Sequence, residues 1–308
     1  MNPVHIVIST RAHPSRGQTL RLLRPLFGLP DVKIEVVTHN AGMRASLIAQ
    51  GHDLFPIHLS GIPRDIGITG MVETRDWVTN NLGTVGEWIT LVDDNISHVE
   101  RVDPDHYGEL GDVDGNLDVG DSTGDENGVG WREIYGYRAD PAQLIVHIRE
   151  LIELCEDSKT ILGGFGYLDN PFFRGKKIKR GSYVKGKMYV HKPDGVPYRL
   201  SPELLIMSDF AKTLDVLTRY GSVVVNDWVR PVHERWQEGG IGSLAARMPY
   251  RLTSVSWMAE HWEGLVRITR GESGEDDWMR ISKRPGRSLD SWRAEWGRQH
   301  PDQPMFNL

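Results

Sequence analysis

The chain has 308 residues, and its 36 lysines and arginines against 42 aspartates and glutamates give a net charge of −6. This balance excludes a polycationic nucleic-acid binder, so any nucleic-acid contact must come from a local basic patch. The lone cysteine, Cys155, excludes an intramolecular disulfide and a zinc site made of several cysteines. No apolar run approaches the roughly 20 residues that span a bilayer, and the N-terminus lacks the features of a signal peptide. We therefore expect a soluble, cytoplasmic protein that makes no membrane contact.

The N-terminal third of the chain alternates predicted strands with predicted helices. The strands are short, apolar and β-branched, whereas the helices carry apolar residues at a spacing of three and four. The predicted strands are Val4–Thr10, Lys33–His39, Asp53–Leu59 (a strand or an extended segment) and Glu87–Ile96, and the predicted helices are Gln18–Gly28, Ala41–Gln50 and Gly67–Gly83. This alternation predicts an α/β fold with a mostly parallel central sheet and helices on both faces. Ligands of such sheets bind at the carboxyl ends of the strands.

Residues 102–131 differ in composition from the rest of the chain. They contain no lysine or arginine, nine acids fall between Asp103 and Glu126, and seven glycines fall between Gly108 and Gly130. We interpret this segment as a mobile acidic insertion. A calcium loop starting at Asp112 is the alternative, but Leu117 stands where an EF-hand needs glycine.

The second half continues the α/β pattern. A helix is predicted at Asp140–Ser158, a strand at Ser182–Lys192, and a helix followed by a strand within Ser201–Asp227. From Glu272 onward the chain is polar and bears tryptophans. We expect one domain over residues 1–270 and a polar, weakly packed extension over residues 271–308.

The sharpest chemical signal is the triplet Asp93-Asp94-Asn95, which ends a buried predicted strand. Adjacent carboxylates at a sheet edge are costly unless a cation or hydrogen-bond donors satisfy them. Hard cations such as Mg²⁺ and Mn²⁺ take carboxylate oxygens together with phosphate oxygens of a ligand. The alternative is that these acids cap a turn.

The order of the motifs resembles nucleotide-sugar glycosyltransferases of the GT-A fold, a Rossmann-like arrangement. Thr74-Arg75-Asp76-Trp77 lies on a predicted helix before the acidic strand end, where that fold carries a DxD motif; here Asn95 replaces the second aspartate. Four later segments are similar to the phage and eukaryotic glycosyltransferases associated with TET/JBP oxygenases, which include the base J glucosyltransferase: ILGGFGYLDNPFFR, YVKGKMYVHK, MSDFAKTLDVLTRYGSVVVND and QEGGIG. The resemblance covers about residues 4–268.

The resemblance implies transfer of a sugar from a UDP-sugar to the hydroxyl of a 5-hydroxymethylpyrimidine, preferably 5-hydroxymethylcytosine, in phage DNA. It implies a Mn²⁺ or Mg²⁺ ion held by Asp94 and Asn95, although an amide oxygen is the weaker ligand. Asp209 is the expected general base for the acceptor hydroxyl, with a helix N-cap as the alternative role. The expected nucleotide-sugar contacts are Thr10, Arg11, His39, Arg75, Asp93, Gly163, Gly164 and Asp169. Surface ion pairs for the arginines and tight turns for the glycines remain alternatives.

One basic run stands out in this acidic chain. Seven positive charges fall within 14 residues without an acid among them: Arg174, Lys176, Lys177, Lys179, Arg180, Lys185 and Lys187. Such a patch suits a phosphodiester backbone, and flanking aromatics suit an unpaired base. A solvated strand face or a clamp on the diphosphate is the alternative.

Three other functions stay open at this stage. The acceptor could be a protein or a glycan. A nucleotidyltransferase would also use metal and acids at a sheet edge, but no lysine-bearing glycine-rich loop follows the first strand. A catalytically silent DNA-binding module is the third, and the acids at positions 93, 94 and 209 speak against it.

Overall fold

The structure is a computed structural model. It describes residues 3–13, 17–62, 71–101, 137–139, 141–166, 178–198, 204, 206–233, 244–270, 277–281, 289–299 and 301–302. The predicted acidic insertion at 102–131 lies outside these residues. Among the residues described, no helix is both long enough and apolar enough to span a membrane.

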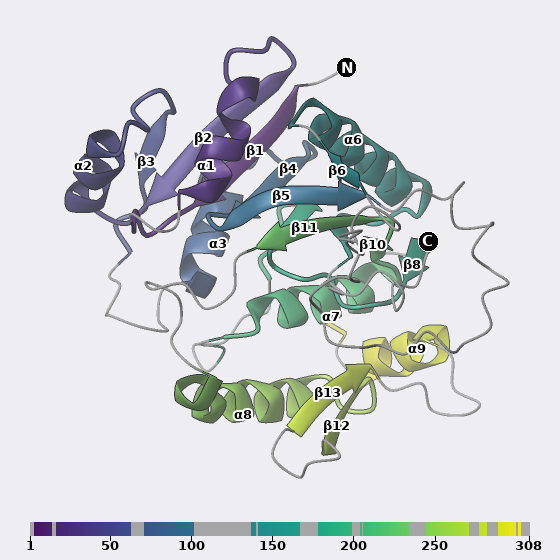
Figure 1. The fold of residues 1–308 in the computed structure, drawn as a ribbon. Coiled ribbons are helices and arrows are strands. Elements are labelled where there is room, and N and C mark those ends of the chain that lie inside the picture. The colour runs from purple at the N-terminus through teal and green to yellow at the C-terminus, as the bar shows by residue number, and fades with distance from the viewer. Residues whose placement is uncertain are drawn as a thin grey trace, which may run out of the picture.

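An eight-stranded sheet forms the centre of the molecule, in the order β3-β2-β1-β4-β9-β7-β10-β8 (Figure 1). The pairs β3–β2, β2–β1, β1–β4 and β7–β10 are parallel, whereas β9 runs antiparallel to both β4 and β7 and β8 runs antiparallel to β10. The α/β class and the mostly parallel sheet are therefore confirmed. Its strands are β1 (Val4–Ser9), β2 (Val32–Thr38), β3 (Ile57–Leu59), β4 (Ile89–Asp93), β7 (Leu162–Phe165), β8 (Ile178–Arg180), β9 (Met188–His191) and β10 (Val224–Asn226).

Two smaller sheets and seven α-helices complete the described fold. The order β11-β5-β6 makes a three-stranded sheet, and β12 pairs with β13. These strands are β5 (Ile96–Arg101), β6 (Tyr137–Ala139), β11 (Val229–His233), β12 (Val266–Arg270) and β13 (Asp277–Ile281). The helices are α1 (Gln18–Leu23), α2 (Ala41–Ala49), α3 (Met71–Asn81), α6 (Pro141–Asp157), α7 (Ser208–Tyr220), α8 (Leu244–His261) and α9 (Leu289–Gln299).

Of the predicted Asp53–Leu59 only Ile57–Leu59 is strand, and two further predicted strands are also shorter than expected. Glu87–Ile96 was expected to be one strand, but it breaks at Asp94-Asn95 into β4 of the large sheet and β5 of the small one. In Ser182–Lys192 only Met188–His191 is strand, because the preceding residues leave the sheet to contact α3 and α7. In both places tertiary contacts override the β-propensity of the sequence.

Period-two alternation in the strands produces two apolar layers. Along β1, Ile6 and Ile8 join a core cluster with residues of α1 and α6, whereas Val7 joins a second cluster with Val78 of α3 and Val216 of α7. The sheet is therefore covered on both faces, as the sequence predicts.

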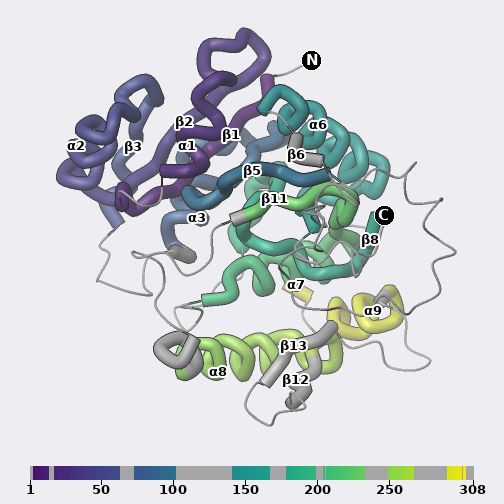
Figure 2. The backbone as a smooth tube through the Cα atoms, in the orientation of Figure 1, coloured from purple at the N-terminus to yellow at the C-terminus, as the bar shows by residue number. Residues whose placement is uncertain are grey.

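Helix α9, in the predicted C-terminal extension, packs more firmly than expected for a weakly packed segment. Trp292 and Trp296 of α9 are 4% exposed and belong to a third core cluster with Trp262, which follows α8. The Arg293 side chain donates to the backbone oxygens of Thr218 and Arg219, at 2.9 and 2.6 Å, and so ties α9 to the end of α7. The ribbon places α8, α9 and the β12–β13 pair together on the side of α7 away from β1 and β2 (Figure 1), and the tube shows the same for α9 (Figure 2).

Gly163 in β7 permits the close approach of α6 to the sheet. A Cβ atom there would lie 2.4 Å from the Cys155 sulfur and 3.1 Å from Leu151 Cδ1. We predict that Gly163→Ala lowers the free energy of unfolding by about 1–3 kcal/mol through overpacking, measured by urea denaturation.

The matched control removes the sulfur. In the Cys155→Ala background the sulfur is absent and only the contact with Leu151 remains, so Gly163→Ala should cost less free energy there than in the wild type. Equal costs in the two backgrounds would contradict the close approach.

Candidate active site

Polar side chains gather where three neighbouring parallel strands end. Thr10 follows β1, His39 follows β2 and Asp93 is the last residue of β4. The Thr10 hydroxyl donates a hydrogen bond of 2.8 Å to Asp94 Oδ2, and both residues are buried. The structure therefore brings the predicted residues Thr10, Asp93 and Asp94 together at the carboxyl edge of the sheet.

A threonine of α1 fixes the acidic turn. Thr19 Oγ1 donates to the Asp93 backbone oxygen at 2.6 Å and accepts from the Ile96 amide at 2.8 Å, while the residue is fully buried. These bonds on both sides of Asp94-Asn95 hold the turn that ends β4. Sequence reasoning missed Thr19, because a threonine inside an amphipathic helix carries no signal of a distant partner.

Arg75 of α3 lies behind the acids. Its Nη2 donates to Asp93 Oδ1 at 3.1 Å and to the Gly186 backbone oxygen at 2.9 Å, and its Nη1 contacts Ser208 Oγ at 3.4 Å. Burial alone lowers the pKa of this guanidinium, but the Asp93 carboxylate and other nearby groups outweigh burial and raise it above its ordinary value. Arg75 therefore stays charged and positions Asp93; the predicted nucleotide contact stays a prediction.

Gly186 joins Arg75 to the expected general base. A Cβ atom on Gly186 would lie 2.5 Å from Arg75 Nη1, so a larger residue would displace the guanidinium. The Gly186 amide donates to Asp209 Oδ2 at 2.9 Å. One residue therefore contacts both Arg75 through its carbonyl oxygen and Asp209 through its amide. Sequence reasoning also missed Gly186, whose neighbours Lys185 and Lys187 drew attention instead.

Asp209 lies in the first turn of α7, where a carboxylate interacts favourably with the helix dipole. The N-cap of α7 is Met207, in a left-handed conformation with φ of 65°, so the alternative role of Asp209 as N-cap is wrong. Its carboxylate accepts from the Gly186 and Phe210 amides, at 2.9 and 3.1 Å. These two bonds orient the carboxylate, which remains partly exposed.

The other residues expected to contact the nucleotide sugar do not share one environment. Arg11 follows Thr10 and is half-buried, and the buried His39 ring lies 3.3 Å from the Ser60 hydroxyl. Gly163 and Gly164 lie inside β7, where a Cβ atom would meet Cys155 at the first and Val184 at the second. Packing therefore explains both glycines, and neither lies in a tight turn. Asp169 lies outside the described residues.

The described members of the basic run occupy two separate places. Lys179 and Arg180 lie on β8, where Lys179 pairs with the buried Asp227 and Arg180 donates to Ser158 Oγ at 3.0 Å. Lys185 and Lys187 flank Gly186 and lie with the acids. The run is therefore not one continuous patch in the part that the structure describes, and Arg174, Lys176 and Lys177 lie outside that part.

The two lysines at the acids are partly desolvated. Burial lowers the pKa of Lys187 to about 8, with Arg230 acting in the same direction and Asp93 opposing it. Burial also lowers the pKa of Lys185, whose Nζ lies 4.1 Å from the centre of the Phe210 ring. A lysine that is incompletely hydrated interacts strongly with an arriving anion. Their partial burial argues against a solvated strand face for these two lysines, and their ligand stays a prediction.

The acids fit a divalent metal that shares its coordination with a ligand. Within the described residues, no group of three or more His, Cys, Asp or Glu side chains could hold a metal ion. Asp93, Asp94 and Asn95 nevertheless offer carboxylate and amide oxygens on one turn, next to Lys187. Mg²⁺ and Mn²⁺ are commonly bound by one or two carboxylates plus phosphate oxygens and water, so the donor set fits that mode.

Comparisons with known proteins find similarity in structure alone. No family model and no curated protein matches the sequence. Glucosyl-3-phosphoglycerate synthase from Mycobacterium tuberculosis, crystallised with Mn²⁺, UDP and glucosyl-3-phosphoglycerate, aligns with a TM-score of 0.45 and 10% identity over 91% of this chain and 87% of that chain. A second structure, described as a mycobacterial protein, aligns with a TM-score of 0.41 and 12% identity over 91% and 84%. At these scores neither likeness assigns an activity to this chain.

The charges around Lys187 predict how its pKa responds to substitution. Asp93→Asn removes a negative charge and should lower the pKa below about 8, whereas Lys185→Met removes a positive charge and should raise it. NMR titration of ¹³C-labelled lysine side chains measures both shifts. Asp31→Asn is the control, since Asp31 pairs with Arg149 elsewhere on the molecule. An Asp93→Asn variant with an unchanged or raised pKa would contradict this arrangement.

Proposed function

We propose that the chain is a GT-A-type glycosyltransferase that moves a sugar from a UDP-sugar to an acceptor hydroxyl with the help of Mn²⁺ or Mg²⁺. The observation that carries the proposal is the connected series Asp93–Arg75–Gly186–Asp209, with contacts of 2.9 to 3.1 Å. It links an acidic turn suited to a metal and a diphosphate with a separate carboxylate suited to accept a proton. The order of the motifs in the sequence supports the class and the UDP-sugar donor.

The roles follow from the charges. Asp94 and Asn95 would hold the metal ion, with Asp93 beside them against Arg75. A metal at this turn would neutralise charge on the diphosphate of the donor. Lys187, which stands next to Asp93, offers a second positive charge to the same leaving group below a pH of about 8.

Asp209 would act as the general base for the acceptor hydroxyl. The acceptor oxygen forms a bond to the anomeric carbon while the bond from that carbon to the diphosphate oxygen breaks, and the electron pair leaves with UDP. The hydroxyl proton passes to the Asp209 carboxylate. The Gly186 and Phe210 amides keep that carboxylate oriented through the step. Attack in line with the leaving group inverts the anomeric centre.

The first prediction of this proposal concerns donor turnover. Purified protein with Mn²⁺ should release UDP from at least one UDP-sugar in the presence of an acceptor. Mass spectrometry measures the released UDP and the sugar added to the acceptor. Asp209→Asn removes the proton acceptor with little change of shape and should lower kcat by about 10²- to 10⁴-fold. Asp94→Asn replaces a charged metal ligand by a weaker one and should raise the Mn²⁺ concentration needed for half-maximal turnover.

The matched control is Asp31→Asn, the same substitution at an ion pair distant from the site, which should leave turnover unchanged. The absence of both turnover and nucleotide binding across a panel of sugar nucleotides would overturn the proposal. It would favour a catalytically silent binding module.

For the acceptor we propose 5-hydroxymethylcytosine in DNA, of phage origin. The resemblance to the TET/JBP-associated glycosyltransferases supports it, and Lys185 adds a positive charge on the Asp209 side of the site. DNA carrying 5-hydroxymethylcytosine or 5-hydroxymethyluracil should gain the mass of one sugar per modified base. Binding should weaken steeply with salt, because phosphate contacts release counterions. Turnover with a protein or glycan acceptor, and none with DNA, would keep the enzyme class and overturn this acceptor.

A further inference from the structure

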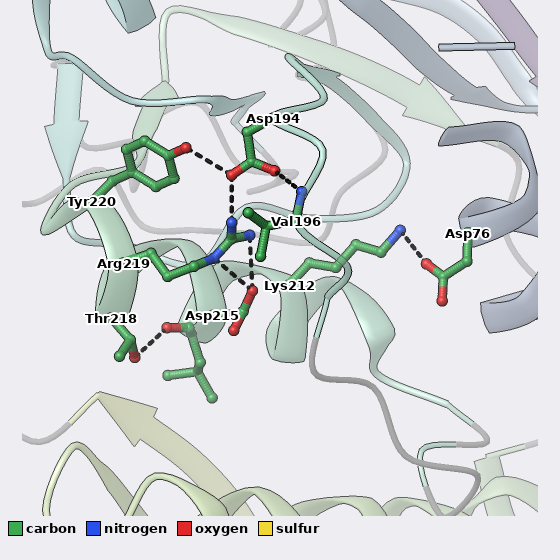
Figure 3. A network of polar contacts seen from close by, with 9 residues as sticks. Asp76, Asp194, Val196, Lys212, Asp215, Thr218, Arg219 and Tyr220 are labelled. Carbon is green, nitrogen blue, oxygen red and sulfur yellow. Dashed lines mark hydrogen bonds and ion pairs between the residues drawn. The ribbon is translucent and has the colours of Figure 1, made fainter. Parts of the chain in front are cut away.

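Helix α7 carries a stripe of charge into the interior. Lys212, Asp215 and Arg219 recur at spacings of three and four, so they share one face of the helix, and they are 2%, 0% and 1% exposed. Figure 3 shows this face with its partners. Charged side chains are rarely buried unless they are paired, so each of these charges needs a partner on a neighbouring element.

The end of α7 is fixed to the segment that follows β9. The Arg219 guanidinium bonds to Asp215 on its own helix, at 3.0 Å from Nε, and to Asp194 beyond β9 (Figure 3). The Tyr220 hydroxyl donates to Asp194 at 2.7 Å, and the Val196 amide donates to the other oxygen of the same carboxylate at 3.0 Å. Asp194 therefore receives three donors and anchors this end of the helix.

The middle of α7 is tied to α3 instead. Lys212 Nζ lies 2.9 Å from Asp76 Oδ1, and the two side chains are 3% and 31% exposed. Lys212 Nζ also lies 4.8 Å from the centre of the Tyr198 ring. In Figure 3 the lysine reaches from α7 toward Asp76 on the neighbouring helix.

This ion pair joins the two helices that carry Arg75 and Asp209. Asp76 follows Arg75 on α3, and Lys212 lies three residues after Asp209 on α7. The two helices meet a second time where Arg75 Nη1 contacts Ser208 Oγ at 3.4 Å. Two ties at neighbouring positions define how far the first turn of α7 lies from Arg75, and therefore where Asp209 stands relative to Asp93.

We propose that Lys212 and Asp76 are positioning residues, whose ion pair sets the distance between the Asp209 carboxylate and the Arg75–Asp93 pair. This inference rests on the proposed glycosyltransferase function. Replacing both members of a desolvated ion pair by neutral groups of similar size often leaves stability unchanged, whereas removing one member leaves an uncompensated charge. Stability alone therefore gives little reason for the pair, and its place between the two helices that carry Arg75 and Asp209 gives a better one.

The test compares one neutral double variant with a rescue and a control. Asp76→Asn with Lys212→Met removes both charges, Lys212→Arg keeps the positive charge, and Asp31→Asn with Arg149→Met makes the same change at an ion pair outside α3 and α7. The double variant should melt within about 4 °C of the wild type. It should keep its KM for the donor but lose at least about tenfold in kcat, because small displacements of a reacting group are costly. Lys212→Arg should recover most of kcat, and the control should leave it unchanged.

A second readout does not depend on turnover. The Gly186 amide bonds to Asp209 Oδ2, so its hydrogen exchange should speed up in the double variant and stay slow in the control. Unchanged kcat and unchanged exchange at Gly186 would overturn the positioning role. So would a double variant that fails to fold, because the pair would then serve stability. A wild-type chain that transfers no sugar would overturn the proposed function, and exchange at Gly186 would still decide the role of the pair.

Discussion

The candidate site depends on one buried guanidinium. Arg75 is 7% exposed, and its nitrogen atoms contact Asp93 on β4, the backbone of Gly186 before β9 and Ser208 at the start of α7. A desolvated arginine is tolerable only when carboxylates and carbonyl oxygens surround it. The three elements that carry the acidic turn, the lysine pair and Asp209 must therefore converge on it, and the site is assembled around this charge.

Convergence on one charge explains why small residues matter here as much as the acids. Gly186 must lack a side chain because the guanidinium occupies that space, and Thr19 must carry a hydroxyl because the turn after β4 presents both a carbonyl and an amide to it. Polar groups buried without such partners would each cost free energy of folding. Gly186 and Thr19 therefore hold the acids in position without taking part in the proposed reaction themselves.

The sequence was sufficient for the α/β class and for the position of the acids at the edge of the sheet. Short β-branched runs and helical spacing predicted the α/β class, and the triplet at the end of β4 was placed at the correct edge of the sheet. The roles of Thr19, Gly186 and Lys212 were beyond reach, because each is defined by a partner 23 to 136 residues away in the chain. The basic run shows the opposite failure: seven neighbours in sequence suggested one surface, but the described ones separate because β8 and β9 are not adjacent in the sheet.

The reversed direction of β9 has a consequence for where ligand-binding residues are to be sought. Between β4 and β7 this strand runs against its neighbours, so its beginning, not its end, lies at the edge where β1, β2 and β4 finish. Lys185, Gly186 and Lys187 reach the acids because they enter β9 there, and the Asp93 amide bonds to the Lys187 carbonyl at 2.8 Å. The exit of β9 leads to Asp194, which holds the opposite end of α7. Because β9 is antiparallel, this edge of the sheet is built both from residues that follow strands and from residues that precede one. A search confined to the residues after each strand would overlook Lys185, Gly186 and Lys187.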